Sequence, residues 1–232
     1  MCGIFGSFSF KNYEKFYNEN KKRGTFAYGS LYVCREKSIF MKKASGVSDL
    51  TEDRAFAKDG YELYLGHTQA PTSIQREFSP RTSHPFEDMY HIVAHNGVLE
   101  NAREIMNENL IGHINAVDSS VIPALIGTLF ELTELPPLDD LQHKTDELLV
   151  IEKACNILKG TFACWIYSKL TDCTYLVRSG STLFGNLLTG DFSSTVIPGM
   201  CESTLKEGIV YCVTAEGLAE CGEFNSNSPF FL

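Results

Sequence analysis

The sequence predicts an α+β protein, a four-layer αββα sandwich in which two mostly antiparallel sheets pack face to face between outer helices. Two observations lead to this fold. Strand-like runs fill both ends of the 232-residue chain, and helix-like periodicity fills its middle. Each packed sheet keeps one free face that helices can cover. The length and the absence of internal repeats predict a single domain over residues 1–232.

Hydrophobic pattern and β-branched or aromatic content locate the elements. Strands are expected at 2–10, 31–35, 38–42, 61–68, 91–94, 161–168, 173–177, 183–197 and 208–221. Helices are expected at 11–22, 100–109, 119–132 and 147–158. Gly24 could end the first helix, and Tyr13, Phe16 and Tyr17 form its apolar face. The proline-containing stretch 70–88 predicts a long loop, which in a compact domain is usually functional or disordered.

Composition excludes several classes of function. The net charge is −9 and no Lys/Arg run is long enough for a nucleic-acid site. No stretch of eighteen apolar residues exists, so no membrane span is expected. The eight cysteines contain no C-x-x-C pair. We therefore expect reduced, mostly buried thiols such as Cys164 in a cytoplasmic protein, with no metal site and no cofactor.

The chain opens Met-Cys-Gly-Ile-Phe-Gly. Removal of Met1 would leave a free α-amine on Cys2. An α-amine has an ordinary pKa of about 7.7–8.0, so it could take the proton of the thiol on the same residue. The alternative is that a Met-Cys start is accidental, or only the edge of a first strand.

Four further segments occur in a characteristic order. They are Arg23-Gly24 with Gly29, Gly66-His67-Thr68 with Thr72, His84-Pro85, and His95-Asn96-Gly97-Val98-Leu99-Glu100-Asn101 followed by Asp118. Together with the Met-Cys start, they resemble the motifs of class II, N-terminal-nucleophile glutamine amidotransferases over roughly residues 2–180. The overall character is similar to standalone domains of this family that some tailed phages encode.

The resemblance implies the αββα fold and hydrolysis of the glutamine side-chain amide to glutamate and ammonia. It makes Cys2 the nucleophile, and the Asn96 side chain and the Gly97 N–H the donors to the developing oxyanion. It gives Asp118 the substrate α-ammonium and Thr72 a hydrogen bond to the substrate, with His84 bracing the substrate loop. Two alternatives remain open: Asn96-Gly97 as a type I′ hairpin turn, and Asp118 as a helix N-cap.

One position departs from the family pattern. Gln69 stands where the family has the arginine that holds the substrate α-carboxylate, and a neutral amide cannot form a charge-assisted fork. Arg76 or Arg81 could replace it, or the substrate could be another amide. The chain has no room for a synthetase domain, so we expect a separate ammonia-accepting synthetase subunit. If Met1 is retained, the alternative is a non-catalytic binding module.

Overall fold

The computed structural model describes residues 2–34, 39–46, 50–56, 60–70, 79–108, 117–133 and 140–226. One sheet is built from β1 (Gly3–Ser7), β2 (Ala27–Cys34), β3 (Ile39–Ser45), β4 (Tyr61–Gln69), β9 (Phe184–Gly185), β10 (Phe192–Ser193) and β11 (Ser203–Thr204). The other contains β5 (Phe86–Glu87), β6 (His91–Leu99), β7 (Gly160–Ser168), β8 (Thr174–Ser179), β12 (Ile209–Thr214) and β13 (Gly217–Glu223). The helices are α1 (Phe10–Asn20), α2 (Thr51–Phe56), α3 (Ala102–Glu108), α4 (Val121–Leu132) and α5 (Asp140–Ile157), with a 3₁₀ turn η1 (Asp118–Ser120).

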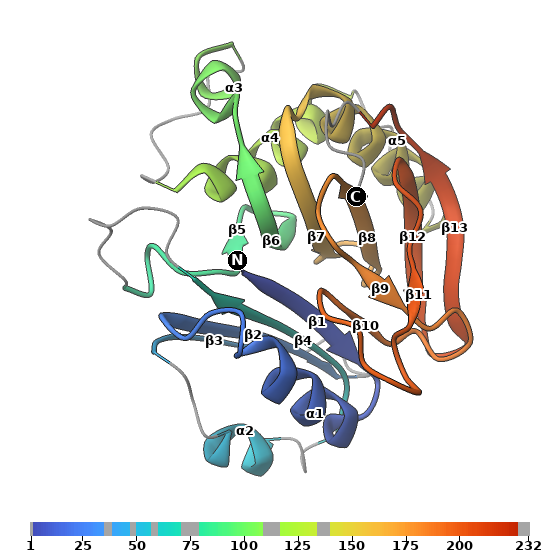
Figure 1. Ribbon diagram of the computed structural model, residues 1–232. Coiled ribbons are helices and arrows are strands. Elements are labelled where there is room, and N and C mark those ends of the chain that lie inside the picture. Colours follow the sequence, from blue (N-terminus) through green and yellow to red (C-terminus); the bar gives the residue numbers. More distant parts are fainter. Residues whose placement is uncertain are drawn as a thin grey trace.

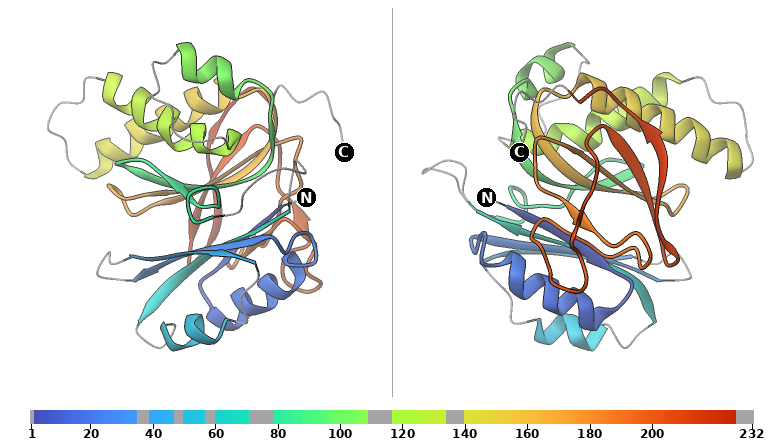
Figure 2. Two further views of the ribbon diagram at one scale, coloured as in Figure 1. Left: turned by 90° about the vertical axis from the view of Figure 1, so that its left-hand side faces the viewer. Right: turned by 45° about the vertical axis from the view of Figure 1, so that its right-hand side comes forward.

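The predicted αββα architecture is confirmed (Figures 1 and 2). The first sheet has the order β11-β9-β10-β1-β4-β2-β3, and the second has the order β13-β12-β8-β7-β6-β5. Neighbouring strands pair antiparallel throughout both sheets. Helices α1 and α2 cover the outer face of the first sheet, while α4 and α5 cover that of the second.

Three hydrophobic clusters hold the layers together. The inter-sheet cluster includes Ile4, Leu65, Ala94 and Trp165. A second cluster joins α1 to the first sheet and contains the predicted apolar face of that helix, Tyr13, Phe16 and Tyr17. A third joins α4 and α5 to the second sheet. Burial of apolar area in these clusters is the main force that keeps the four layers in contact.

Helix α2 was missed in the sequence, where its region is polar and has no clear period. This short helix is fixed by tertiary contacts instead. Asp53 is fully buried and accepts hydrogen bonds from the hydroxyl groups of Tyr32 at 2.5 Å and Tyr28 at 3.2 Å. Both tyrosines belong to β2, so the carboxylate ties α2 to the underside of the first sheet.

Two other expectations about helices need correction. Helix α1 ends at Asn20, before Gly24. A side chain at Gly24 would collide with the backbone of Gln69 and Ala70, so this glycine serves a close approach to β4. Helix α5 begins at Asp140, seven residues earlier than its apolar pattern predicts.

All eight cysteines are free thiols, as expected. Cys164 is fully buried, but Cys34, Cys173 and Cys212 are half-buried and Cys221 is exposed. Over the described ranges, no helix is long and apolar enough to cross a membrane. The same part of the chain contains no cluster of three or more His, Cys, Asp or Glu residues able to hold a metal ion.

Candidate active site

Cys2 lies directly before β1, and Figure 1 marks the N-terminal end of the chain between the two sheets. It is 8% exposed, and its Sγ lies 3.7 Å from the carbonyl oxygen of Ala70. The register pairs Gly3 with Thr68, which puts Gln69 beside Cys2 one step further along β4. Side chains alternate along a strand, and Ile4 faces the inter-sheet core. Cys2 therefore faces the same space.

Arg23 supports the backbone of Cys2. Its Nε donates to the Cys2 carbonyl oxygen at 2.8 Å, and its Nη1 donates to the Ser194 carbonyl oxygen at 3.0 Å. Burial lowers the pKa of the Arg23 guanidinium, and the nearby Cys2 thiol opposes that effect. The sequence motif Arg23-Gly24 pointed to this region but assigned no role to the arginine.

Asn96 and Gly97 lie within β6, which continues to Leu99 in register with β7. The hairpin-turn alternative is therefore wrong. Gly97 has φ +152°, and a Cβ there would fall on the carbonyl oxygen of Thr161. Only glycine can take this position without displacing β7.

Ser194 links the two halves of the site. Its Oγ accepts a hydrogen bond from the Ile4 backbone N–H at 3.0 Å and from the Asn96 Nδ2 at 3.4 Å. Its backbone N–H donates to the Ile4 carbonyl oxygen at 2.8 Å. Ser194 is fully buried and thus connects β1, the strand that follows Cys2, to the side-chain amide of Asn96. No sequence signal marks Ser194, because its partners lie 190 and 98 residues away.

Asp118 is half-buried and does not cap a helix, so the N-cap alternative is also wrong. The cap residue of η1 is Val117, and that of α4 is Ser120. The Oδ2 of Asp118 accepts the backbone N–H of Leu99 at 3.0 Å. The carboxylate therefore secures the end of β6 two residues after Gly97. Its binding of a substrate ammonium stays a prediction.

Three buried histidines brace the space around the site. The His67 and His84 rings stack with centroids 3.9 Å apart, and the His67 Nε2 donates to the His95 carbonyl oxygen at 3.2 Å. The His95 Nε2 donates to the Thr161 carbonyl oxygen at 3.3 Å, so its Nδ1 accepts from the Ser119 hydroxyl at 2.8 Å. Burial lowers the pKa of His95, which keeps this ring neutral.

The structure says less about the other residues expected at the site. Thr72, Arg76 and Met1 lie outside the described residues. Gln69 is buried at the end of β4, and Arg81 is exposed. The roles of Gln69, Arg81 and His84 toward substrate stay predictions.

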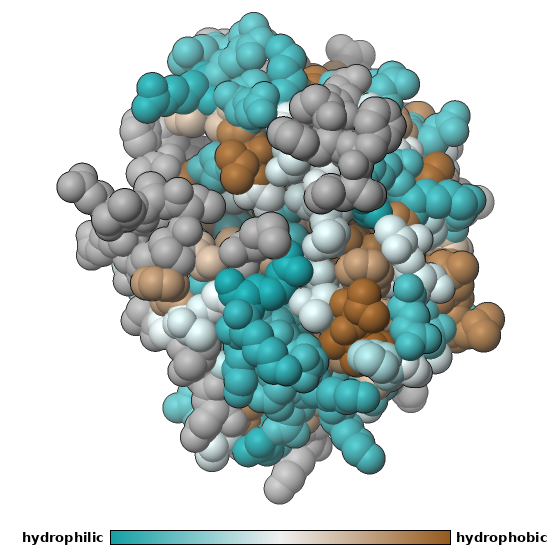
Figure 3. All heavy atoms as spheres, viewed as in Figure 1, coloured by the Kyte–Doolittle hydropathy of each residue, from teal (hydrophilic) through white to brown (hydrophobic). Residues whose placement is uncertain are grey.

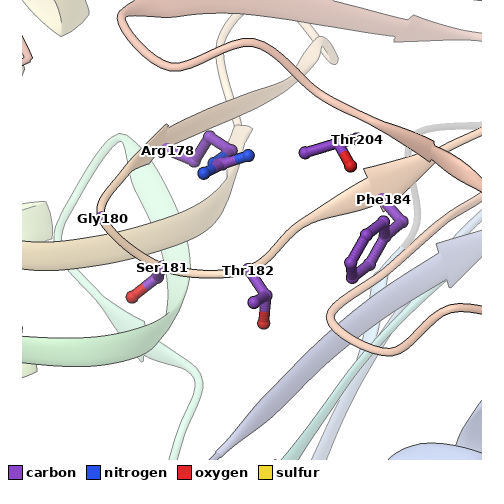
Figure 4. A pocket seen from close by; sticks show the side chains of 6 residues that line it. All are labelled: Arg178, Gly180, Ser181, Thr182, Phe184 and Thr204. Carbon is purple, nitrogen blue, oxygen red and sulfur yellow. The ribbon is translucent and has the colours of Figure 1, made fainter. Parts of the chain in front are cut away.

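A cavity of about 200 Å³ lies close to this network. It is lined by Arg178, Gly180, Ser181, Thr182, Phe184 and Thr204 (Figure 4). The Thr182 hydroxyl points away from the Arg178 guanidinium and donates to the Ser194 carbonyl oxygen at 3.0 Å. Thr182 also accepts a hydrogen bond from Arg23 Nη2 at 3.4 Å. This threonine therefore separates the cavity from the backbone that supports Cys2.

Sequence comparison finds distant relatives. No protein-family model matches the chain. It is 25% identical over 182 residues to a 7-cyano-7-deazaguanine synthase 2 of Sulfurisphaera tokodaii, covering 73% of this chain and 36% of the relative. It is 26% identical over 201 residues to a glutamine–fructose-6-phosphate aminotransferase of Streptococcus pyogenes, covering 82% of this chain and 31% of that enzyme. The chain spans about a third of the length of these curated relatives.

Solved structures of other proteins share the fold. The glutamine phosphoribosylpyrophosphate amidotransferase of Bacillus subtilis superimposes with a TM-score of 0.72 at 16% identity, over 97% of this chain and 50% of that one. A glutamine aminotransferase class-II domain protein from Silicibacter pomeroyi gives 0.55 at 14% identity, over 97% and 99% of the two chains. The chain is therefore similar in fold to these two proteins and similar in sequence, at 25–26% identity, to part of the two curated enzymes.

Proposed function

We propose that the chain hydrolyses the side-chain amide of glutamine to glutamate and ammonia, with Cys2 as nucleophile. The observation that carries the proposal is the junction at Ser194, which holds Asn96 against the strand that follows Cys2. A thiol and a fixed amide donor facing one inter-sheet space are what acyl transfer through a thioester requires.

The proposed reaction begins with Met1 removed. The α-amine of Cys2 takes the thiol proton, and the sulfur attacks the amide carbon. The Asn96 Nδ2 and the Gly97 N–H stabilise the oxyanion. The ammonium returns its proton to the leaving nitrogen, so ammonia departs and a thioester remains. Water, deprotonated by the same amine, then releases glutamate and restores the thiol.

Cys2→Ala tests the nucleophile. We expect glutamate release to fall to background with an unchanged melting temperature, because alanine fills most of the same volume. Cys34→Ala is the matched control, since Cys34 is a half-buried thiol at the far end of β2. Activity above about a tenth of wild type in Cys2→Ala would defeat the assignment. Measuring the intact mass of the protein shows whether Met1 is removed, and so whether the α-amine of Cys2 is free to act as the base. Retained Met1 would favour a non-catalytic binding module.

The substrate α-carboxylate needs a cation, and Gln69 cannot supply one. Within the proposal, Arg76→Ala raises the glutamine KM much more than Arg81→Ala does. Equal and small effects would show that the carboxylate is held elsewhere. The burial of Gln69 beside Cys2 favours a second candidate, an amidohydrolase for another γ-glutamyl or acyl amide. Glutamate release from glutamine, compared with a panel of primary amides, separates the two.

Ammonia is largely protonated at neutral pH, so its use in synthesis requires a protected route to an acceptor. We therefore propose a synthetase partner that docks at the mouth of the site. Val98 supports this, because it follows Gly97 and is 53% exposed. On the face seen in Figure 3, hydrophobic residues form small patches among hydrophilic ones. A glutaminase assay with and without co-purified proteins tests the partner: stimulation by a co-purified protein is expected.

A further inference from the structure

We propose that Ser119 is a positioning residue, which acts through the ring of His95 to fix the backbone of Gly97. The inference rests on the proposed function, in which the Gly97 N–H is one of the two oxyanion donors. Ser119 belongs to η1, and only 4% of it is exposed. It approaches β6 from the helix-covered face of the second sheet, whereas Cys2 faces the inter-sheet space.

The His95 ring lies directly against Gly97. A Cβ added to Gly97 would come within 2.8 Å of the His95 Nε2, so the imidazole fills the space beside the Gly97 backbone. Val93 and Leu99, which belong to the cluster that joins α4 and α5 to the second sheet, lie two residues before His95 and two after Gly97 on β6. All four positions face the helices, because every second side chain of a strand lies on one face. A tilt of the buried ring would therefore move the peptide that carries the proposed donor.

Two hydrogen bonds fix the orientation of this ring. The His95 Nε2 donates to the Thr161 carbonyl oxygen at 3.3 Å, which sets the tautomer. The Nδ1 can then only accept, and the Ser119 hydroxyl donates to it at 2.8 Å. Burial lowers the pKa of His95 against the opposing effect of the Asp118 charge, so the ring stays neutral and the Nδ1 keeps its lone pair. The imidazole is therefore held from η1 on one side and from β7 on the other.

The same short turn also holds the other end of this segment. The Leu99 N–H donates to the Asp118 Oδ2 at 3.0 Å, whereas the Val98 N–H points toward β7 and donates to a threonine hydroxyl there at 3.3 Å. Alternate N–H groups of a strand point to the same edge, so the Gly97 N–H lies on the Leu99 edge, away from β7. Two adjacent residues of η1, Asp118 and Ser119, thus secure β6 on both sides of Gly97.

The single proton of the Ser119 hydroxyl has two acceptors within reach. The Ser119 Oγ lies 2.8 Å from the His95 Nδ1 and 3.4 Å from the Asp118 Oδ1. The shorter distance and the fixed tautomer of His95 assign the proton to the ring. The two assignments differ in their kinetic signature. Support of Gly97 through His95 acts on the developing oxyanion and is expressed in kcat, whereas donation to Asp118 would compete with the substrate ammonium and be expressed in KM.

Ser119→Ala, assayed in the whole chain, separates these two assignments. Loss of one neutral hydrogen bond that orients the ring is expected to lower kcat for glutamine up to about tenfold and to leave KM close to wild type. Ser119→Thr keeps the hydroxyl and is expected to recover most of the kcat. Ser120→Ala is the matched control, because this adjacent buried serine donates to the Val117 carbonyl oxygen at 2.6 Å within η1. It is expected to lower the melting temperature to a similar extent with kcat unchanged.

A spectroscopic readout separates this proposal from the glutaminase assignment. In the NMR spectrum of the substrate-free protein, the His95 Nδ1 resonance is expected to shift in Ser119→Ala, and amide hydrogen exchange over residues 95–99 is expected to become faster. Both are expected to stay as in wild type in Ser120→Ala. If these signals respond but wild type releases no glutamate, the glutaminase assignment is wrong and the support of Gly97 stands. Unchanged ring and exchange signals in Ser119→Ala, a changed KM with unchanged kcat, or an equal loss of kcat in Ser120→Ala overturns the proposal.

Discussion

Ser194→Ala isolates the junction between the two sheets. The substitution removes an oxygen that accepts hydrogen bonds from Ile4 N–H and from the Asn96 amide. The first loss leaves a buried backbone donor unsatisfied, which costs about 1–3 kcal/mol of folding stability. The second loss frees the Asn96 amide to rotate. The proposed oxyanion donor then remains present, but its orientation is no longer fixed.

The expected kinetic effect follows from these contacts. Removing an oxyanion donor altogether lowers the rate by about 10²–10³. Loss of one neutral hydrogen bond that orients the donor corresponds to about 0.5–1.5 kcal/mol, so kcat is expected to fall up to about tenfold. The glutamine KM is expected to stay close to wild type, because Ser194 contacts the backbone of Ile4 and the Asn96 side chain, which in the proposed reaction acts only on the developing charge.

A double-mutant cycle with Asn96→Ala separates a catalytic effect from a merely structural one. Glutamate release is measured for both single variants and for the double variant, and melting temperatures are recorded in parallel. If Ser194 acts through Asn96, the double variant is no slower than Asn96→Ala alone. Ser194→Thr retains the hydroxyl and is expected to recover most of the kcat. Additive rate losses in the cycle would refute the reasoning, as would a fall in melting temperature with unchanged kcat.

Two further substitutions test other parts of the structure. Gly97→Ala forces a Cβ onto the Thr161 carbonyl oxygen at φ +152°, so both melting temperature and glutaminase rate should fall; a variant with native activity would exclude the tight β6–β7 contact. His91→Gln breaks a buried pair in which the His91 Nε2 lies 3.2 Å from the Glu147 Oε1. Burial opposes both charges. The hydrogen bond from His91 to Glu147 and the Asp88 carboxylate, 3.5 Å from the His91 Nδ1, raise the pKa of His91 above 6.5, and the same hydrogen bond lowers the pKa of Glu147 below 4.5. The pair therefore stabilises most between about pH 4.5 and 6.5, and its contribution falls as pH rises through the folded pKa of His91. The difference in melting temperature between wild type and His91→Gln should shrink toward pH 8, and a pH-independent difference would contradict this assignment.

The layer order could be predicted from the sequence, because it depends on the average hydrophobic pattern and the long strands and helices each show that pattern over their whole length. Helix α2 was not predictable, because its six residues are held by one buried carboxylate that accepts hydrogen bonds from tyrosines of β2. The Asn96-Gly97 pair shows the same limit at the site. Its local preference is a hairpin turn, but pairing with β7 keeps it in extended ladder geometry. Tertiary pairing overrides local preference in both places.

The candidate site residues divide along similar lines. Cys2, Asn96, Gly97 and Asp118 could be named because each stands in a short sequence motif. Ser194 could not, since its role depends on contacts with residues 190 and 98 positions away. Its identity as a small hydroxyl residue in a loop gives no local signal, and only the packing of the two sheets reveals its partners.

Directional contacts between the sheets explain how a thiol on one sheet can be aligned with an amide on the other. Apolar packing holds the sheets together but does not fix their lateral position, because it has no preferred direction. Hydrogen bonds that cross the interface near the candidate site include three: Trp165 Nε1 to the Gly66 carbonyl oxygen at 3.1 Å, His67 Nε2 to the His95 carbonyl oxygen at 3.2 Å, and Asn96 Nδ2 to Ser194 Oγ at 3.4 Å. The first two involve residues next to each other on β4, the strand that pairs with β1 behind Cys2. Sliding one sheet past the other would break all three, so the position of Cys2 relative to Asn96 is set by the fold before any substrate binds.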